Sequence, residues 1–427
     1  MNTHSTPRGQ HLVSADKGVA SRARFSGWLS KGGAALFHKL IDKIDAGLEF
    51  GAIEGLLPDG TTRLVGGRGP GPIGEITIHS WNTFVRLARS GSVGFYKAWE
   101  AGEWSSKDPV VIFDLFMRNA TTLGSTARSH GIWRLAKRFL HRLRGNSKKQ
   151  ARRNIAFHYD LGNDFYASWL DETMVYSSAM FEQPYQASEP LEAAQIRKID
   201  HLLDRLHLRP GQALLEIGCG WGGLGHRARS RHDVNYTGIT LSDEQAIWAR
   251  DWLKRDGLDQ GSRIDLIDYR DVAGQFDAIA SVEMVEAVGQ QYWPIYLETI
   301  AARLKPGGRA ALQYIAINDA LFPAYEEGVD FIQTYIFPGG MLLSETRFRA
   351  LAEENGLRWA DQVNFGLDYA ETLKRWRRRF DTAIEAGNLP PGFDEKFVRL
   401  WRYYLMYCEG GFRGGGIHVA QVTLVKE

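Results

Sequence analysis

The stretch LLEIGCGWGGLGHRA, from Leu214 to Ala228, places an apolar, strand-like run directly before a cluster of glycines. Four of the six residues from Gly218 to Gly223 have no side chain. Glycine is needed where the backbone turns tightly or where another molecule approaches the main chain closely. The stretch therefore predicts a strand, a turn that carries a binding site, and a helix that follows the turn.

The pattern around this turn repeats along the second half of the chain. Segments with helical periodicity, such as SDEQAIWARDWLKRDG, separate short apolar runs. The apolar runs are ALLEIGCG, VNYTGIT, IDLIDY, FDAIASV and RAALQYIAI. Strands that alternate with helices are typical of an α/β domain with a parallel sheet. The last run, GIHVAQVTLVKE, alternates well enough to predict a final antiparallel strand.

The length of 427 residues and the composition, 44% hydrophobic and 24% charged, predict a soluble protein with two domains. The polar stretch GNSKKQARRN places a boundary near residue 150. We expect a disordered tail over 1–40, a small α+β domain over 41–125, a linker helix over 126–153 and the α/β domain over 154–427.

Several signals bear on the cellular compartment. Only Cys219 and Cys408 are present, which argues against a disulfide framework and fits a reducing cytoplasm. No apolar run approaches 18 residues, so no transmembrane helix is expected. The N-terminal stretch has no apolar core of the kind found in secretory signals. These features predict a cytoplasmic protein.

Charge is concentrated in one segment, residues 128–153, which has ten Lys and Arg and no acidic residue. Trp133, Leu135, Phe139 and other apolar residues recur within it at helical spacing. A basic amphipathic helix of this kind suits an anionic membrane surface. A solvated linker helix that packs on its own protein explains the pattern equally well. No nucleic-acid-binding motif accompanies the charge, so no nucleic-acid partner is expected.

The glycines at 218, 220 and 223 also match the dinucleotide fingerprint G-x-G-x-x-G, which by itself is weak evidence. A dinucleotide fold needs an acid at the end of the second strand, to hold the ribose, whereas VNYTGIT ends in Thr240. The acid lies earlier, at Glu216 in the first strand. This position suits the ammonium group of S-adenosylmethionine.

The run LIDYRDV supplies Asp268 and Tyr269 at the end of a later strand, where they could hold and stack an adenine. Tyr269 could instead be a packing residue. S-adenosylmethionine is therefore favoured over a nicotinamide cofactor.

A series of motifs in this order resembles the cyclopropane-fatty-acyl-phospholipid synthases and the related mycolic acid methyltransferases. The motifs are HYDLGNDFYASWLDETMVYSSAMFE, LLEIGCGWGGL, GITLSDEQ, DYRDV, SVEMVEAVG, YIFPGG, NFGLDYAETLKRW and CEGGFR. The resemblance is strong over about residues 150–427 and weaker before that, at SGSVGFYKAWEAGEW.

The resemblance implies a seven-stranded, Rossmann-like class I methyltransferase sheet that binds S-adenosylmethionine and acts on a cis double bond of a phospholipid acyl chain. It also implies a homodimer and peripheral association with the inner face of the membrane. Together with Glu216, the implied cofactor contacts are Tyr176, Ser177, Gly218, Gly220, Gly222, Thr240, Gln245, Asp268 and Tyr269.

Methyl transfer to an alkene leaves a carbocation, which a dry aromatic pocket can stabilise. Tyr335 and Tyr403 are among the candidates for that pocket, although most aromatic residues of a chain lie in its core. A base must then remove a proton. In the family this base is a bicarbonate ion, and the matching positions are Glu286, Gln313 and Tyr369 with backbone from Ser178 and Ile315.

The chain departs from the family at this base site. Ser178 replaces a usual Cys, Gln313 replaces a His that could carry a proton, and Ala287 replaces a second His. The cofactor motifs are intact, so methyl transfer is expected. A cyclopropane is the expected product, and a methyl-branched or methylene chain is the alternative. A soluble small-molecule acceptor and a non-catalytic membrane protein are the remaining hypotheses.

Overall fold

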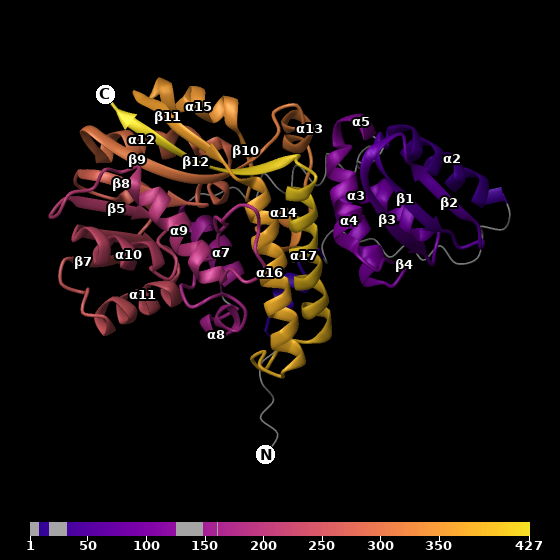
Figure 1. The fold of residues 1–427 in the computed structure, drawn as a ribbon, viewed down its shortest axis with the longest axis horizontal. Coiled ribbons are helices and arrows are strands. Elements are labelled where there is room, and N and C mark those ends of the chain that lie inside the picture. Colours follow the sequence, from indigo (N-terminus) through magenta and orange to yellow (C-terminus); the bar gives the residue numbers. More distant parts are fainter. Residues whose placement is uncertain (1–7, 17–31, 125–147, 160) are drawn as a thin grey trace, which may run out of the picture. The chain divides into compact units, whose positions relative to one another are not determined.

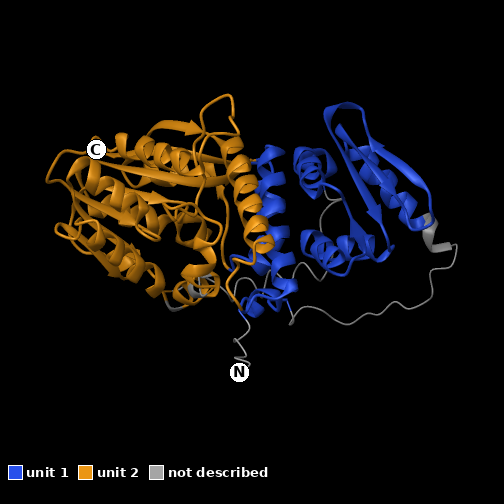
Figure 2. Ribbon diagram, turned by 60° about the horizontal axis from the view of Figure 1, so that its bottom comes forward, with its two compact units in different colours: residues 1–144, 320–338, 392–417 blue, residues 145–319, 339–391, 418–427 orange. Residues whose placement is uncertain are grey.

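The computed structural model describes residues 8–16, 32–124, 148–159 and 161–427. The chain forms two compact units (Figure 2). Unit 1 comprises residues 1–144, 320–338 and 392–417, and unit 2 comprises residues 145–319, 339–391 and 418–427.

The units do not follow the single boundary that the sequence suggests near residue 150. Residues 320–338 and 392–417, which we expected within the second domain, belong to unit 1. Most of the basic linker, residues 126–147, lies outside the described part of the chain, so its predicted helix stays a prediction. Residues 148–153 begin the helix Lys148–Tyr159.

Unit 1 contains a four-stranded sheet with the strand order β2-β1-β3-β4 (Figure 1). Its strands are β1 (Phe50–Leu56), β2 (Thr62–Gly66), β3 (Gly69–Ile78) and β4 (Trp104–Ser105). Its helices are α1 (Gln10–Val13), α2 (Gly32–Gly47), α3 (Asn82–Glu100), α4 (Pro109–Arg118), α5 (Ala120–Leu123), α13 (Phe322–Glu326), α14 (Phe331–Tyr335) and α17 (Glu395–Arg413). The mixture of sheet and helices agrees with the α+β domain expected before residue 125.

An aromatic cluster explains why two late segments join unit 1. The ring of Tyr403 on α17 lies 5.0 Å from Tyr96 on α3, 5.2 Å from Phe113 on α4 and 4.8 Å from Phe331 on α14. Edge-to-face rings at these spacings add to the stabilisation from burial. Tyr403 and Tyr335 are thus core residues of unit 1, which is the packing role considered for them from the sequence.

Unit 2 contains the expected methyltransferase sheet, in the order β11-β12-β9-β8-β5-β6-β7, with β10 paired to β9 (Figure 1). The strands are β5 (Ala213–Ile217), β6 (Asn235–Thr240), β7 (Ser262–Leu266), β8 (Phe276–Val282), β9 (Leu304–Ile317), β10 (Leu343–Ser344), β11 (Leu357–Asn364) and β12 (Ile417–Lys426). The five strands from β5 to β9 pair in parallel, and β12 pairs with β11 antiparallel.

The helices of unit 2 precede the first strand of this sheet or connect its strands. They are α7 (Lys148–Tyr159), α8 (Asn163–Ala167), α9 (Leu191–Asp204), α10 (Gly223–His232), α11 (Asp243–Arg255), α12 (Trp293–Arg303), α15 (Glu345–Glu354) and α16 (Gly366–Glu385), with the 3-10 turns η1 (Tyr269–Asp271), η2 (Val285–Ala287) and η3 (Gln290–Tyr292). Within the described ranges, no helix is long and apolar enough to cross a membrane.

The central strand β5 is apolar because both faces of the sheet are covered. Leu214 is fully buried in a core with Leu202 of α9 and Leu253 of α11. Burial of one such side chain contributes about 1.5–3 kcal/mol. The parallel strands end at one edge of the sheet, so the residues after β5, β6, β7 and β8 gather there. Ligands of open α/β sheets bind at this edge.

Candidate active site

The glycine turn, residues 218–223, joins β5 to α10 at this edge. Gly218, Gly220 and Gly222 have φ values of 82°, 51° and 93°, in the left-handed region that favours glycine. A Cβ on Gly218 would lie 2.7 Å from Met284 Cγ, and one on Gly222 would lie 2.9 Å from Ala249 Cβ. The protein itself therefore excludes side chains at these two positions.

Gly220 differs from its neighbours, because a Cβ there would have no atom of the described residues within 4 Å. Its conformation leaves open space beside the main chain rather than a contact with another part of the protein. Gly220 is therefore the position in the turn at which a ligand can approach the backbone. This is the feature of the turn that fits the predicted cofactor.

The acid in β5 has a partner within the protein. The Glu216 carboxylate accepts a hydrogen bond from the hydroxyl of Tyr236 on β6 at 2.5 Å. Burial raises the pKa of Glu216 to about 8, although Tyr236 and Lys198 oppose the rise. The structure thus shows Glu216 as a buried group that links two central strands. Its predicted contact with the ammonium of the cofactor stays a prediction.

The other predicted cofactor residues lie at the ends of β6 and β7. Thr240 Oγ1 donates to Gln245 Oε1 at 2.9 Å, which connects the end of β6 to α11. Asp268 accepts two hydrogen bonds from Arg270, both of 2.7 Å, and Arg270 also lies over the ring of Tyr269. The sheet therefore brings these four predicted residues to the same edge as the glycine turn.

The segment before α9 supplies Tyr176, Ser177 and Ser178. The ring of Tyr176 stacks on His158 of α7, with centroids 5.6 Å apart. Ser177 Oγ accepts a hydrogen bond of 2.6 Å from Lys198 Nζ on α9. Burial lowers the pKa of Lys198 to about 8, while the acidic groups around it oppose this shift. No motif in the sequence points to Lys198.

Three of the predicted base-site residues meet at a carboxylate that the sequence analysis did not name, Glu283. Its Oε1 accepts from the backbone N–H of Ser178 at 2.9 Å and from Gln313 Nε2 at 2.8 Å. Its Oε2 accepts from the hydroxyl of Tyr369 on α16 at 2.7 Å. We call these four residues the carboxylate cluster. Its members come from a loop, β9, α16 and the end of β8.

The backbone at Glu283 is held in an unusual conformation. Its φ is 47°, in the left-handed region that a non-glycine residue adopts at a cost. The Glu283 N–H donates to the carbonyl of Gln313 at 2.7 Å. The next residue, Met284, is the one that faces Gly218. The carboxylate cluster and the glycine turn are therefore directly adjacent.

A line of amide groups orients Gln313. Its Oε1 accepts from Gln421 Nε2 at 3.0 Å, and Gln421 Nε2 also donates to the carbonyl of Lys198. The Gln421 Oε1 lies 2.7 Å from His201 Nδ1. Because Gln313 Oε1 is used as an acceptor, its Nε2 faces Glu283 as a donor. This arrangement favours the charged form of Glu283.

Glu286, which the resemblance places in the base site, has a different environment. Its Oε1 accepts from the backbone N–H of Ile315, so these two predicted residues do meet. Its Oε2 is buried and has no hydrogen-bond partner among the residues that the structure describes. Burial, followed by the nearby charge of Glu283, raises the pKa of Glu286 to about 8. Both effects favour the protonated form of Glu286.

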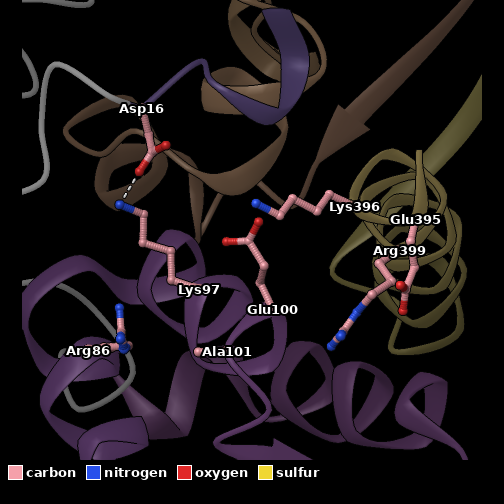
Figure 3. A pocket seen from close by; sticks show the side chains of 8 residues that line it. All are labelled: Asp16, Arg86, Lys97, Glu100, Ala101, Glu395, Lys396 and Arg399. Atoms are coloured by element: carbon pink, nitrogen blue, oxygen red, sulfur yellow. Dashed lines mark ion pairs between the residues drawn. The ribbon is translucent and has the colours of Figure 1, made fainter. Parts of the chain in front are cut away.

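Unit 1 has a charged pocket of its own, of about 530 Å³ (Figure 3). Its charged residues are four basic and three acidic: Arg86, Lys97, Lys396 and Arg399 with Asp16, Glu100 and Glu395. Asp16 forms an ion pair with Lys97, and Lys396 points toward Glu100. The charges thus largely offset one another, and such a polar lining does not suit an acyl chain.

Comparison with known proteins assigns the chain to a family. A family model described as mycolic acid cyclopropane synthetase matches residues 146–422. The chain belongs to this family. It is 39% identical over 435 residues to a tuberculostearic acid methyltransferase of Mycobacterium tuberculosis, and the match covers 100% of this chain and 99% of that protein.

Two further matches cover smaller shares of the chain. The cyclopropane-fatty-acyl-phospholipid synthase of Escherichia coli K12 is 35% identical over 353 residues, which cover 82% of this chain and 88% of that protein. The crystal structure of the mycolic acid cyclopropane synthase CmaA1, complexed with SAH and CTAB, is 31% identical with a TM-score of 0.60. That match covers 64% of this chain and 98% of the other.

These matches confirm the resemblance and the class I methyltransferase fold. The chain is an S-adenosylmethionine-dependent methyltransferase of a family that modifies lipids. The open side of Gly220 and the polar residues at the ends of β6 and β7 fit this cofactor. When bound, S-adenosylmethionine supplies an electrophilic methyl group at this edge of the sheet.

Proposed function

We propose that the protein transfers a methyl group from S-adenosylmethionine to the double bond of an unsaturated phospholipid acyl chain. The observation that carries this proposal is the buried carboxylate cluster directly beside the glycine turn. Glu283 and Met284 follow β8, and Met284 faces Gly218. A methyl donor and a proton acceptor are the two groups that this reaction needs in one place.

The chemistry explains why the acceptor is buried. An alkene is a weak nucleophile, so the methyl group must be held in line and about 3 Å from it. The carbocation that results would be trapped by water, so water must be excluded until a proton is lost. Ser178, Gln313 and Tyr369 are each fully or nearly buried and could hold the acceptor without solvent.

Two products can form from this carbocation. Removal of a proton from the added methyl group, with closure onto the cation, gives the cyclopropane expected from the sequence. Proton loss after a hydride shift gives a methylene or other open-chain product. The second product is favoured by Gln313 and Ala287, which replace histidines of the family, and by the full-length relative named as a methyltransferase.

The test uses the purified protein with S-adenosylmethionine and vesicles of a phospholipid that bears cis-monounsaturated chains. We expect a lipid that is heavier by one CH2 and formation of S-adenosylhomocysteine. Proton NMR of the extracted lipid distinguishes a ring from a methylene group. Methylation of soluble compounds only, or binding of S-adenosylmethionine without any turnover on lipid, would contradict the proposal.

We also propose that residues 128–153 bring the protein to anionic membranes. Each basic residue near such a surface contributes about 1 kcal/mol before screening. Replacement of Arg134, Lys137, Arg138 and Arg142 by Gln should weaken sedimentation with anionic vesicles, most strongly at low salt. Equal binding to neutral and anionic vesicles would contradict it. The homodimer implied by the resemblance stays a prediction.

A further inference from the structure

The hydrogen-bond donors at the predicted base site do not fit a bicarbonate ion. The family resemblance assigns the side chains of Glu286, Gln313 and Tyr369, with backbone from Ser178 and Ile315, to such an ion. In the structure, three of these donors bind the Glu283 carboxylate, and Ile315 binds Glu286. A bicarbonate would have to displace a carboxylate that is attached to the chain.

We propose that the Glu283 carboxylate is itself the proton acceptor of the reaction, in place of a bound bicarbonate. This inference rests on the proposed lipid methylation and names the base for it. Glu283 directly follows β8, and its neighbour Met284 faces the glycine turn. A base attached to the protein is positioned without a binding equilibrium, which makes its effective concentration high.

The three donors match the two oxygens of Glu283. Oε1 accepts two hydrogen bonds and Oε2 accepts one, from the hydroxyl of Tyr369. The φ of 47° directs the Glu283 side chain into this set of donors at some conformational cost. Such strain is retained where the surrounding structure requires it, as at a reactive site.

The charges around Glu283 support an ionised carboxylate. Burial raises the pKa of Glu283, while Lys198, Tyr369, Ser178 and Gln313 oppose the rise. Within the described part of the chain, Glu286 has one donor, the N–H of Ile315, and its other oxygen has no hydrogen-bond partner. Two neighbouring buried carboxylates share their protons as a pair. The three donors to Glu283 favour its charged form, and the burial of Glu286 beside that charge favours the neutral form of Glu286.

The proton balance of the step is complete. The alkene electron pair forms a carbon–carbon bond to the methyl group as the carbon–sulfur bond breaks. Glu283 Oε2 or Oε1 then accepts a proton from the methylated cation, and the released electron pair forms the ring bond or the new double bond. The proton on Glu283 passes to water when the product leaves.

The first test measures the need for bicarbonate. Wild-type protein is assayed on unsaturated phospholipid vesicles in buffer depleted of carbon dioxide, with and without added bicarbonate. We expect the same rate in both. Stimulation of several-fold by bicarbonate would overturn the inference while leaving the lipid methylation established. An absence of any methylated lipid would instead contradict the proposed function.

The second test removes the carboxylate. Glu283→Gln keeps the shape and loses the base, so the rate should fall by about 100-fold or more with unchanged binding of S-adenosylmethionine. Glu283→Gly suits the left-handed backbone and leaves space for a small carboxylate. Added formate or bicarbonate should therefore raise the rate of this variant by at least about ten-fold. The matched change Glu286→Gln should lower the rate by less than about ten-fold.

Three results would overturn the assignment of Glu283. They are full activity of Glu283→Gln, a larger loss in Glu286→Gln than in Glu283→Gln, and a folded Glu283→Gly variant that no small carboxylate rescues. The last result would mean that Glu283 only supports the structure, because a structural role is not restored by a free carboxylate.

Discussion

The glycine turn and the carboxylate cluster lie side by side at the same edge of the sheet, yet they are built in different ways. The turn is a continuous stretch of six residues, and its function depends on the absence of side chains. The cluster combines residues as far apart as Ser178 and Tyr369, and its function depends on the direction of each side chain.

This difference determines how each region responds to change. In the turn, Gly218 and Gly222 are limited by protein contacts, whereas Gly220 has open space beside it. In the cluster, each oxygen of Glu283 has a donor, so the loss of one donor changes the proton affinity of that carboxylate. Substitutions in the turn should therefore affect cofactor binding, and substitutions in the cluster should affect proton transfer.

The largest effect is expected at Gly220. Gly220→Val places a β-branched side chain in the space proposed for the cofactor and at a φ of 51°. We expect the affinity for S-adenosylmethionine, measured by calorimetry, to fall by about 100-fold or more, which corresponds to about 2.7 kcal/mol.

A matched control separates strain from loss of the site. Gly257 also has a positive φ, 69°, and open space where a Cβ would stand, but it lies after the C-terminal end of α11, away from the turn. Gly257→Val should lower stability and leave affinity within about two-fold. Equal loss of affinity in both variants would show that the turn acts only through folding.

The next effect concerns the pH dependence of the rate. Gln313→Met removes a hydrogen bond to ionised Glu283, and such bonds contribute about 1.5–3 kcal/mol. Loss of a donor to the charged form raises the pKa of Glu283, so the acidic limb of the rate profile should move up by about one to two pH units.

Three titratable groups act on Glu283 in this experiment: Lys198 on α9, Glu286 in η2 and Tyr369 on α16. Because all three are retained, the rate of the variant should recover at high pH. A uniform loss of rate at every pH would indicate misplacement of the substrate instead of a change in proton transfer.

A smaller effect is expected in the strands below the turn. Tyr236→Phe removes the hydroxyl that binds Glu216 and leaves a buried carboxyl oxygen without that donor. The free energy of unfolding of unit 2 should fall by about 1–3 kcal/mol in urea titration. The affinity for S-adenosylmethionine should change little, and a large drop in affinity would place Glu216 in direct contact with the cofactor.

The smallest effect is expected for Glu286→Gln. The folded state holds the proton on Glu286 up to about pH 8, whereas the unfolded state releases it near the ordinary value of 4.5. Wild-type stability therefore falls as pH rises between these values. Since Gln does not titrate, the stability of the variant relative to wild type should rise as the pH is raised from 4 to 8, with the smallest difference near pH 4. Parallel stability curves for the two proteins would contradict this.

Much of unit 2 follows from local sequence. The apolar runs predict β5 to β9 because a strand covered on both faces needs a continuous apolar stretch. The alternation in GIHVAQVTLVKE predicts β12. The glycine turn is predictable because the backbone conformation itself requires glycine. The sequence also places Thr240, Asp268 and Tyr269 at the carboxyl ends of strands, where parallel pairing brings them together.

Other features were decided only by the tertiary structure. Glu283 and Glu286 stand three residues apart in SVEMVEAVG, and the sequence alone favours Glu286 by its match to the family. The acidic residue directly after β8 was the available signal for Glu283. The φ of 47° at Glu283 and its three hydrogen-bond donors distinguish it from Glu286. The donors Ser178, Gln313 and Tyr369 lie 105, 30 and 86 positions away in the chain. Side-chain direction at such a site is set by packing between distant elements, which no local pattern encodes.

For the same reason, residues 320–338 and 392–417 join unit 1 through aromatic contacts, although they follow the methyltransferase strands in the chain.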